Sequence, residues 1–174
     1  QFTKAKDSPD NIVFGGSIAS SKMKMGPASM QISFPIPTSI GGTSGKTQNL
    51  KLKLKNVIIK GTAAKDKLSS GVIAGALPKK EITDTILPVA TPLIDEYYNS
   101  KDIKSSVKSI LKQLLDTDGN GTITQKELKN NTLLFGSSGV LSGDLDLDGD
   151  GKKDALSLGV GYSAVKAMIK SSSK

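Results

Sequence analysis

Residues 50–62 read LKLKLKNVIIKGT, and this stretch decides the type of fold that we expect. Leu50, Leu52 and Leu54 alternate with lysines, so an extended strand would carry its leucines on one face and its ammonium groups on the other. Such a strand is typical of an antiparallel sheet with one buried and one solvated face. A membrane strand would share the alternation, and we favour the ordinary sheet.

Shorter β-prone runs lie on both sides of this strand. They stand between glycine, proline and serine turn signals and comprise residues 11–14, 30–36 and 72–77. The C-terminal segment 155–170, ALSLGVGYSAVKAMIK, alternates larger apolar residues with smaller ones, which also favours a strand. We therefore predict a β domain from residues 11–77 and 155–170, whose antiparallel strands form a sandwich or barrel with the C-terminal strand returning to the sheet.

The pattern becomes helical after Pro78. A helix over residues 79–86 is expected to stop before Pro88, and a second helix to begin with Thr91 as its N-cap and Pro92 at its first position. A third helix is predicted over residues 101–115. Its apolar stripe has the i, i+3, i+4, i+7, i+8 spacing and consists of Val107, Ile110, Leu111, Leu114 and Leu115.

These elements predict an α+β fold with an inserted helical segment. The segment covers residues 78–154, contains two aspartate-rich loops and separates the two parts of the β domain. Residues 1–10 are expected to form a flexible leader, and residues 171–174 a tail.

The first aspartate-rich loop follows the third predicted helix and reads DTDGNGTITQKE. Calcium loops of twelve residues present oxygen ligands at positions 1, 3, 5, 7, 9 and 12. Those positions are occupied by Asp116, Asp118, Asn120, Thr122 (through its carbonyl), Thr124 and Glu127. Gly121 allows the sharp turn at position 6, and Thr124 with Glu127 forms a capping box for the next helix. A plain acidic turn would not need Glu127, so we predict a Ca²⁺ site.

The second loop reads GDLDLDGDGKKDALS over residues 143–157. Its best register places the oxygen ligands on Asp146, Asp148, Asp150, Lys152 (through its carbonyl) and Asp154. Position 12 is then Ser157, which offers no bidentate carboxylate, and Asp144 is a further candidate ligand in its place. Clustered carboxylates repel one another unless a cation neutralises them. We expect a second Ca²⁺ here, with a solvated acidic turn as the alternative.

Composition excludes several classes of function. The 174 residues include neither Cys nor His, which removes the usual zinc and haem ligands and the Ser-His-Asp and Cys-His catalytic arrangements. Outside the two loops no pair of carboxylates stands out, so we do not expect an enzyme. The net charge of +8 comes from lysines without arginine, and aromatic residues are scarce, which argues against nucleic acid. An anionic surface, a lipid or a glycan therefore remains a candidate partner. No run of apolar residues is long enough to be a transmembrane segment.

Two resemblances add to this interpretation. Residues 107–128 resemble the EF-hand superfamily, which implies direct coordination at the loop positions named above and a water-mediated contact at Thr124. GVIAGALP (71–78) and DLDGDGKKDALSLGVGYSAVKA (146–167) resemble calcium-loop-bearing envelope lipoproteins of Gram-negative bacteria. That resemblance implies a secreted or cell-envelope protein, in the periplasm or at the outer membrane surface.

The expected function is calcium binding without catalysis, in which Ca²⁺ stabilises the fold. The alternative is a lipid- or glycan-binding module whose β domain holds a cavity or groove, with calcium purely structural. A buried volume lined by the face of Leu50, Leu52 and Leu54 would favour that alternative.

Overall fold

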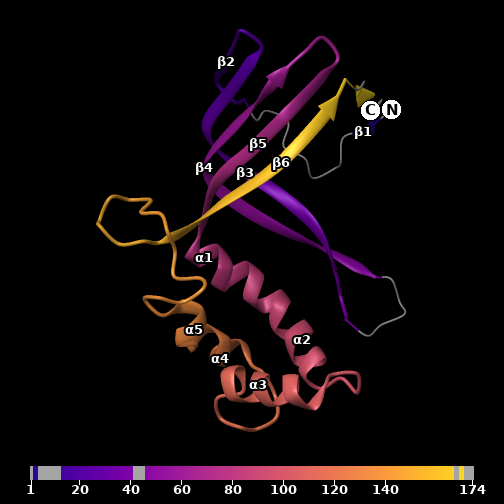
Figure 1. Cartoon of the computed structure of the whole chain (residues 1–174), viewed down its shortest axis with the longest axis vertical. Helices are drawn as coiled ribbons and strands as arrows, with labels where there is room; N and C mark the ends of the chain where they lie inside the picture. Colours follow the sequence, from indigo (N-terminus) through magenta and orange to yellow (C-terminus); the bar gives the residue numbers. More distant parts are fainter. Residues whose placement is uncertain (1, 4–12, 41–45, 167–168, 171–174) are drawn as a thin grey trace. The chain divides into compact units, whose positions relative to one another are not determined.

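The computed structural model describes residues 2–3, 13–40, 46–166 and 169–170, and it combines a sheet with several helices (Figure 1). Five strands form one antiparallel sheet in the order β2-β3-β4-β5-β6. They are β2 (Gly16–Ala19), β3 (Lys22–Pro37), β4 (Thr47–Ala63), β5 (Lys67–Pro78) and β6 (Ala155–Val165). Two short strands, β1 (Phe2–Thr3) and β7 (Ile169–Lys170), pair in parallel in a separate sheet. The α+β class is therefore confirmed.

The sheet is open, and the predicted sandwich or barrel is not confirmed. Within the described residues β2 and β6 lie at the two edges of the five-stranded sheet, and they do not pair with each other. Strands β2 to β5 pair in chain order, as short connections favour, and the sheet stays open because its last strand, β6, pairs with β5 and not with β2. The C-terminal strand does return to the sheet, but it extends the sheet beside β5 without closing it.

Strands β3, β4 and β5 are longer than their sequence signals, whereas β6 ends at Val165, before the predicted end at residue 170. The predicted runs 30–36 and 72–77 are parts of β3 and β5, and the leucine-lysine alternation lies in β4. Leu52 and Leu54 are buried while their lysine neighbours are exposed, so the two-faced strand is confirmed. The run 11–14 begins outside the described residues, and its last two residues precede the first strand of the large sheet. Residues 1 and 4–10 of the expected leader and the tail 171–174 also lie outside the described residues.

The chain divides into two compact units. The first unit comprises residues 1–29, 56–75 and 158–174, and the second comprises residues 30–55 and 76–157. In the first unit the Tyr162 ring covers Gly71 so closely that a Cβ atom there would lie 2.5 Å from the ring. The second unit contains every described helix and both aspartate-rich loops.

The predicted helix end before Pro88 is wrong. Helix α1 (Lys79–Glu81), a π-helical turn (Ile82–Ile86) and helix α2 (Leu87–Tyr98) follow one another without a break. Pro88 lies just after the π-helical turn, at the start of α2, and Pro92 lies inside α2, so the helical stretch continues through both prolines. Thr91 is not an N-cap, since its hydroxyl donates to the Leu87 carbonyl within the helix at 2.6 Å.

Three further helices complete the second unit: α3 (Ser105–Leu115), α4 (Gln125–Asn130) and α5 (Thr132–Phe135). Helix α3 starts later than predicted, and only part of its stripe is covered, because Ile110 and Leu114 stay exposed. The core of the helical region consists of buried Leu87, Tyr98, Ile123 and Leu128, with partly buried side chains of α2, α3 and α5 around them. None of the helices described is both long and apolar enough to cross a bilayer.

Candidate metal centre

The first loop connects α3 to α4 and begins at a buried carboxylate. Asp116 is only 4 % exposed. Its Oδ2 atom accepts hydrogen bonds from the Tyr98 hydroxyl and from the Gly121 N–H, both at 3.0 Å. Its Oδ1 atom is buried without a hydrogen-bond partner among the described residues. A buried carboxylate oxygen without a partner is unfavourable, and a cation in the loop would satisfy it.

Three predicted ligands converge at this loop. One carboxylate oxygen from each of Asp116, Asp118 and Glu127 lies within 4.8 Å of the other two. Asp118 Oδ1 accepts the Asn120 N–H at 3.1 Å, and Asn120 Oδ1 accepts the Thr122 N–H at 2.8 Å, so side chains wind the backbone into successive turns. Gly121 has φ +86°, a conformation that side chains disfavour, which explains the glycine at position 6.

Glu127 closes the loop and caps α4. Its Oε2 atom accepts from the N–H and hydroxyl of Thr124 at 2.9 and 2.8 Å, and the capping box is confirmed. Its Oε1 atom accepts the N–H groups of Thr117 (2.7 Å) and Asp118 (3.3 Å). Burial raises the pKa of Glu127, but these hydrogen bonds outweigh burial and hold the pKa below its ordinary value. Glu127 is therefore ionised at neutral pH, as a calcium ligand must be.

Sequence reasoning missed the contribution of α2. Asp95 Oδ1 accepts the N–H of Ile123, at position 8 of the loop, at 2.7 Å. Asn99 donates to the Gly121 carbonyl at 3.3 Å and to Asp95 Oδ1 at 3.2 Å, and Tyr98 holds Asp116 as described above. The only local signal is that these three polar side chains recur at the i, i+3, i+4 spacing of one helix face. We call Asp95, Tyr98 and Asn99 the α2 clamp.

Tyr98 of the α2 clamp lies beside two charged side chains, Asp116 and Lys108. Burial raises the pKa of the Tyr98 hydroxyl, and the hydrogen bond to Asp116 raises it further. The hydroxyl is thus a permanent donor to Asp116 at neutral pH. On α3, the Lys108 ammonium lies 5.1 Å from the centroid of the Tyr98 ring, within the range of a cation–π contact.

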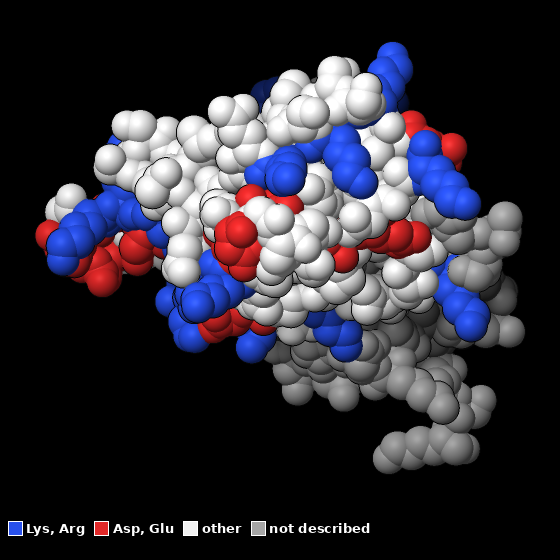
Figure 2. Space-filling model, turned by 90° about the horizontal axis from the view of Figure 1, so that it is seen from below, with Lys and Arg blue, Asp and Glu red and all other residues white. Residues whose placement is uncertain are grey.

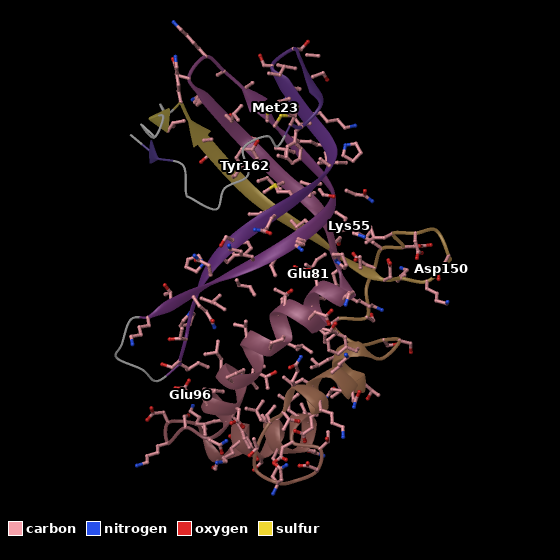
Figure 3. All side chains as sticks on the ribbon, turned by 180° about the vertical axis from the view of Figure 1, so that it is seen from behind. Met23, Lys55, Glu81, Glu96, Asp150 and Tyr162 are labelled. Atoms are coloured by element: carbon pink, nitrogen blue, oxygen red, sulfur yellow. The ribbon has the colours of Figure 1, made fainter. Side chains whose placement is uncertain are left out.

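The second loop connects α5 to β6 and is closed by backbone pairing. Leu145 and Ala155 form an antiparallel bridge, with N–H to carbonyl distances of 3.0 and 3.1 Å. Within the loop one carboxylate oxygen from each of Asp146, Asp148 and Asp150 lies within 4.8 Å of the other two, and all three residues are exposed. Hydrogen bonds from the Gly149 and Gly151 N–H groups hold the pKa of Asp146 below its ordinary value. Figure 3 shows Asp150 on this loop.

The other candidate ligands of the second loop have different partners. Asp154 Oδ1 accepts the Leu147 N–H at 2.9 Å, and the Lys152 ammonium lies 3.3 Å from Asp150 Oδ2. Asp144 Oδ1 accepts the N–H of Ser157 at 2.6 Å, and its Oδ2 accepts the hydroxyl of the same residue. The structure therefore brings three of the predicted carboxylates together, whereas Asp144 forms hydrogen bonds with Ser157, the residue at position 12.

The chain was also compared with known proteins. No protein-family model, no curated protein and no solved structure matches it. The EF-hand and envelope-lipoprotein resemblances therefore stay predictions, and the case for a metal depends on the geometry of the two loops. Their donors are carboxylate, amide, hydroxyl and carbonyl oxygens, the set that Ca²⁺ prefers over softer ligands.

Proposed function

We propose that this is a calcium-binding, non-enzymatic protein in which Ca²⁺ stabilises the fold of residues 76–157. The observation that carries the proposal is the buried Oδ1 atom of Asp116, which has no partner among the described residues. The carboxylate to which it belongs lies beside those of Asp118 and Glu127. Burying this Oδ1 atom away from water without a partner is unfavourable. An ion bound there would offset that cost only in the folded state, and binding to the folded state alone raises stability.

The two loops are proposed to bind with different strength. The first loop is anchored by the buried Ile123 and by the α2 clamp, so its ligands are largely positioned before an ion arrives. The three converging carboxylates of the second loop are exposed, and this loop has no bidentate glutamate. A site whose ligands are already positioned loses less conformational freedom on binding, and we propose that this outweighs the larger number of carboxylates in the second loop. The first loop is therefore the tighter site.

The experiment is a thermal melt with excess calcium and with a chelator. At a free calcium concentration about 100 times the Kd, the free energy of unfolding rises by about 2.7 kcal/mol, and the melting temperature rises with it. Asp118→Asn keeps an acceptor for the Asn120 N–H but removes a ligand charge, so it should shrink the rise. Asp102→Asn removes the same charge from an exposed residue of the same unit and should leave the rise unchanged. Identical melts of the wild type with calcium and with chelator would refute the proposal.

We further propose that the protein is secreted or resides in the cell envelope. Extracellular calcium modules have Kd values of about 10⁻⁴–10⁻³ M, which suits a compartment with millimolar calcium. Isothermal titration measures this directly. A first-site Kd below about 10⁻⁸ M would instead match a cytosolic calcium buffer and contradict this location.

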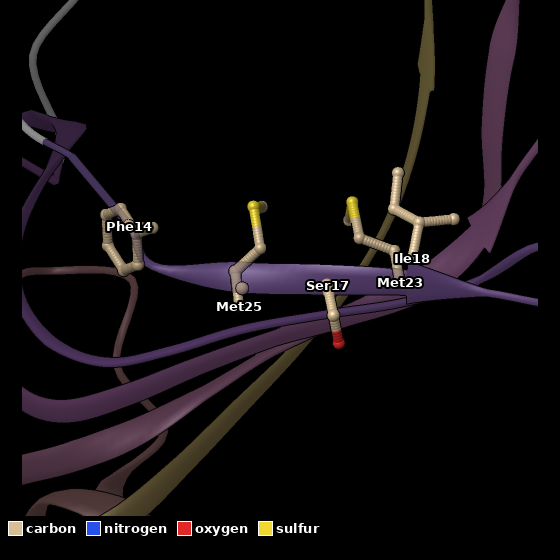
Figure 4. Close-up of a pocket in the computed structure, with 6 residues that line it drawn as sticks. Phe14, Ser17, Ile18, Met23 and Met25 are labelled. Carbon is tan, nitrogen blue, oxygen red and sulfur yellow. The ribbon is translucent and has the colours of Figure 1, made fainter.

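A second candidate function is supported by an open pocket in the first unit. The pocket, of ≈ 210 Å³, lies at the β2–β3 hairpin and is lined mainly by Phe14, Ile18, Met23 and Met25. Figure 4 shows that Ile18 and the two methionines point to the same side of the hairpin. This apolar lining suits a lipid chain better than a glycan. A fluorescent fatty acid that binds the wild type but not Ile18→Ser would favour this lipid-binding module, and no binding would exclude it.

A further inference from the structure

Most of the net positive charge of the chain lies in the first unit. Residues 1–29, 56–75 and 158–174 contain ten lysines and three aspartates, a net charge of +7. The other unit contains fourteen lysines and thirteen acidic residues, a net charge of +1. The face shown in Figure 2 illustrates such mixing, with acidic side chains lying among lysines. An anionic ligand is therefore attracted to the first unit much more than to the second.

Three lysines of the first unit line a single pocket. The pocket has a volume of ≈ 300 Å³, and its lining includes Lys22 and Lys24 of β3, Lys60 of β4, and the hydroxyl residues Thr62 and Ser70. The lining contains no acidic residue. The Lys22 ammonium donates to Thr62 Oγ1 at 3.1 Å, which directs it across the strands. Within the described residues, the ammonium groups of Lys24 and Lys60 have no hydrogen bond or ion pair.

The neighbouring strand leaves these lysines uncovered. In the β2–β3 register Ser17 lies opposite Lys24, and Ala19 lies opposite Lys22, so both lysines face small residues of an edge strand. Ser17 points away from the side on which Ile18, Met23 and Met25 gather (Figure 4). Because side chains alternate along a strand, the lysines share the side of Ser17, opposite to Ile18, Met23 and Met25. Met23 contributes to the lining of both pockets, but the three lysines line only this one, so the two pockets differ in charge.

The geometry points to a binding site for a phosphate group in the pocket of Lys22, Lys24 and Lys60. Ammonium groups gathered without a counter-charge repel one another, and an oxyanion between them reverses the sign of that interaction. Lysine binds phosphate as a point charge with three donors, and the hydroxyls of Thr62 and Ser70 add neutral donors. The same chemistry fits free phosphate and the head group of an anionic phospholipid. This site is independent of the calcium loops, which belong to the other unit.

The test uses the full chain in low-salt buffer with a chelator, so that calcium cannot bridge protein and phosphate. One arm titrates inorganic phosphate and pyrophosphate and follows amide chemical shifts. The other arm measures co-sedimentation with vesicles of phosphatidylcholine alone or with phosphatidylglycerol. The site variant is Lys24→Gln with Lys60→Gln. The matched control is Lys101→Gln with Lys112→Gln, which removes two exposed charges from the other unit. Both variants replace exposed side chains, and a melt confirms that they fold.

The expected result is saturable binding of phosphate, of phosphatidylglycerol vesicles or of both, with shifts centred on Lys24, Lys60 and Thr62. The arm that responds identifies the source of the phosphate. For vesicles the site variant should bind about 30-fold more weakly, because each lysine near an anionic bilayer contributes about 1 kcal/mol, while the control retains wild-type affinity. Absence of binding in both arms would overturn the inference. Equal losses in the two variants would also overturn it, since the effect would then be one of net charge.

Discussion

At the scale of single residues, the two carboxylate oxygens of Asp116 have unequal surroundings. Its Oδ2 atom has two donors within 3.0 Å, whereas its Oδ1 atom is buried and has none among the described residues. A protein selected for stability alone would gain by replacing this carboxylate with a neutral group of the same shape. A bound cation at Oδ1 would explain why an aspartate stands at this position. Replacing the aspartate should then change the free energy of unfolding in opposite directions with and without calcium.

We expect Asp116→Asn to be neutral or stabilising in chelator and destabilising in calcium. The amide keeps an oxygen for Tyr98 and Gly121 but removes the buried charge and the repulsion from Asp118 and Glu127. In calcium the variant loses a direct ligand, so it should lose most of the calcium-dependent gain in stability. Urea unfolding in both conditions measures the two free energies. A variant that is equally less stable in both would show that the aspartate has a structural role only.

The Tyr98 hydroxyl offers a second test at this scale. Tyr98→Phe removes the donor to Asp116 Oδ2 without changing the ring that packs in the core. A hydrogen bond to a charged group contributes about 1.5–3 kcal/mol, so the free energy of unfolding in chelator should fall by that amount. Tyr97→Phe is the control, because Tyr97 is 41 % exposed and has no hydrogen bond through its hydroxyl among the described residues. Equal effects of the two substitutions would contradict the role assigned to Tyr98.

At the scale of elements, α2 supports the first loop in a way that local sequence patterns do not reveal. The oxygen ligands, Gly121 and the capping box are all read from consecutive residues, and the structure brings three of the carboxylates together. The Asp95 contact to Ile123 joins α2 to a loop residue 28 positions later, and a local pattern does not indicate such a pairing. The continuous helix through Pro88 was missed for a related reason. A local rule for proline was outweighed by a π-helical turn and by packing of Leu87 and Tyr98.

Removing the clamp carboxylate should weaken both the fold and calcium binding. Asp95→Ala leaves the N–H of Ile123, a residue only 2 % exposed, without its acceptor. An unsatisfied buried donor costs about 1–3 kcal/mol. The loop also loses its rigid support, so calcium affinity measured by isothermal titration should fall although no ligand has changed. Asp102→Ala, in the turn before α3, should alter neither quantity. Unchanged affinity in Asp95→Ala would mean that the clamp does not position the loop.

The second loop should behave as an independent and weaker site. Asp148→Asn removes one of its three converging carboxylates but keeps an acceptor for the Asp150 N–H. Calcium titration of the wild type should give two bound ions, and the variant should give one, with the affinity of the tighter site unchanged. If the variant still binds two ions, or if the wild type binds only one, the second loop is an acidic turn and not a calcium site.

At the scale of the whole molecule, the sheet shows which features local sequence patterns predict and which they do not. The alternation of Leu52 and Leu54 with lysines predicts a two-faced strand, and their burial confirms it. Whether such strands close into a barrel depends on contacts between distant residues, here on β6 joining β5 and not β2. Neither edge strand has a local sequence pattern that indicates which strand it pairs with. The concentration of charge in one unit was equally hidden, because it appears only when separated segments are grouped.

The division into units predicts where calcium acts. Both loops and the α2 clamp belong to residues 76–157, so bound calcium should slow hydrogen exchange most at amides of α2, α4 and the two loops. Residues 56–75 contain no proposed ligand, and their exchange through local opening should change little, because local openings of separate regions need not be coupled. The double variant Asp118→Asn with Asp148→Asn should remove the protection in the second unit. Mass-spectrometric exchange with calcium and with chelator resolves both regions in one experiment. Equal protection of residues 56–75 would show that calcium stabilises the molecule as one cooperative whole, and the two units would then unfold together.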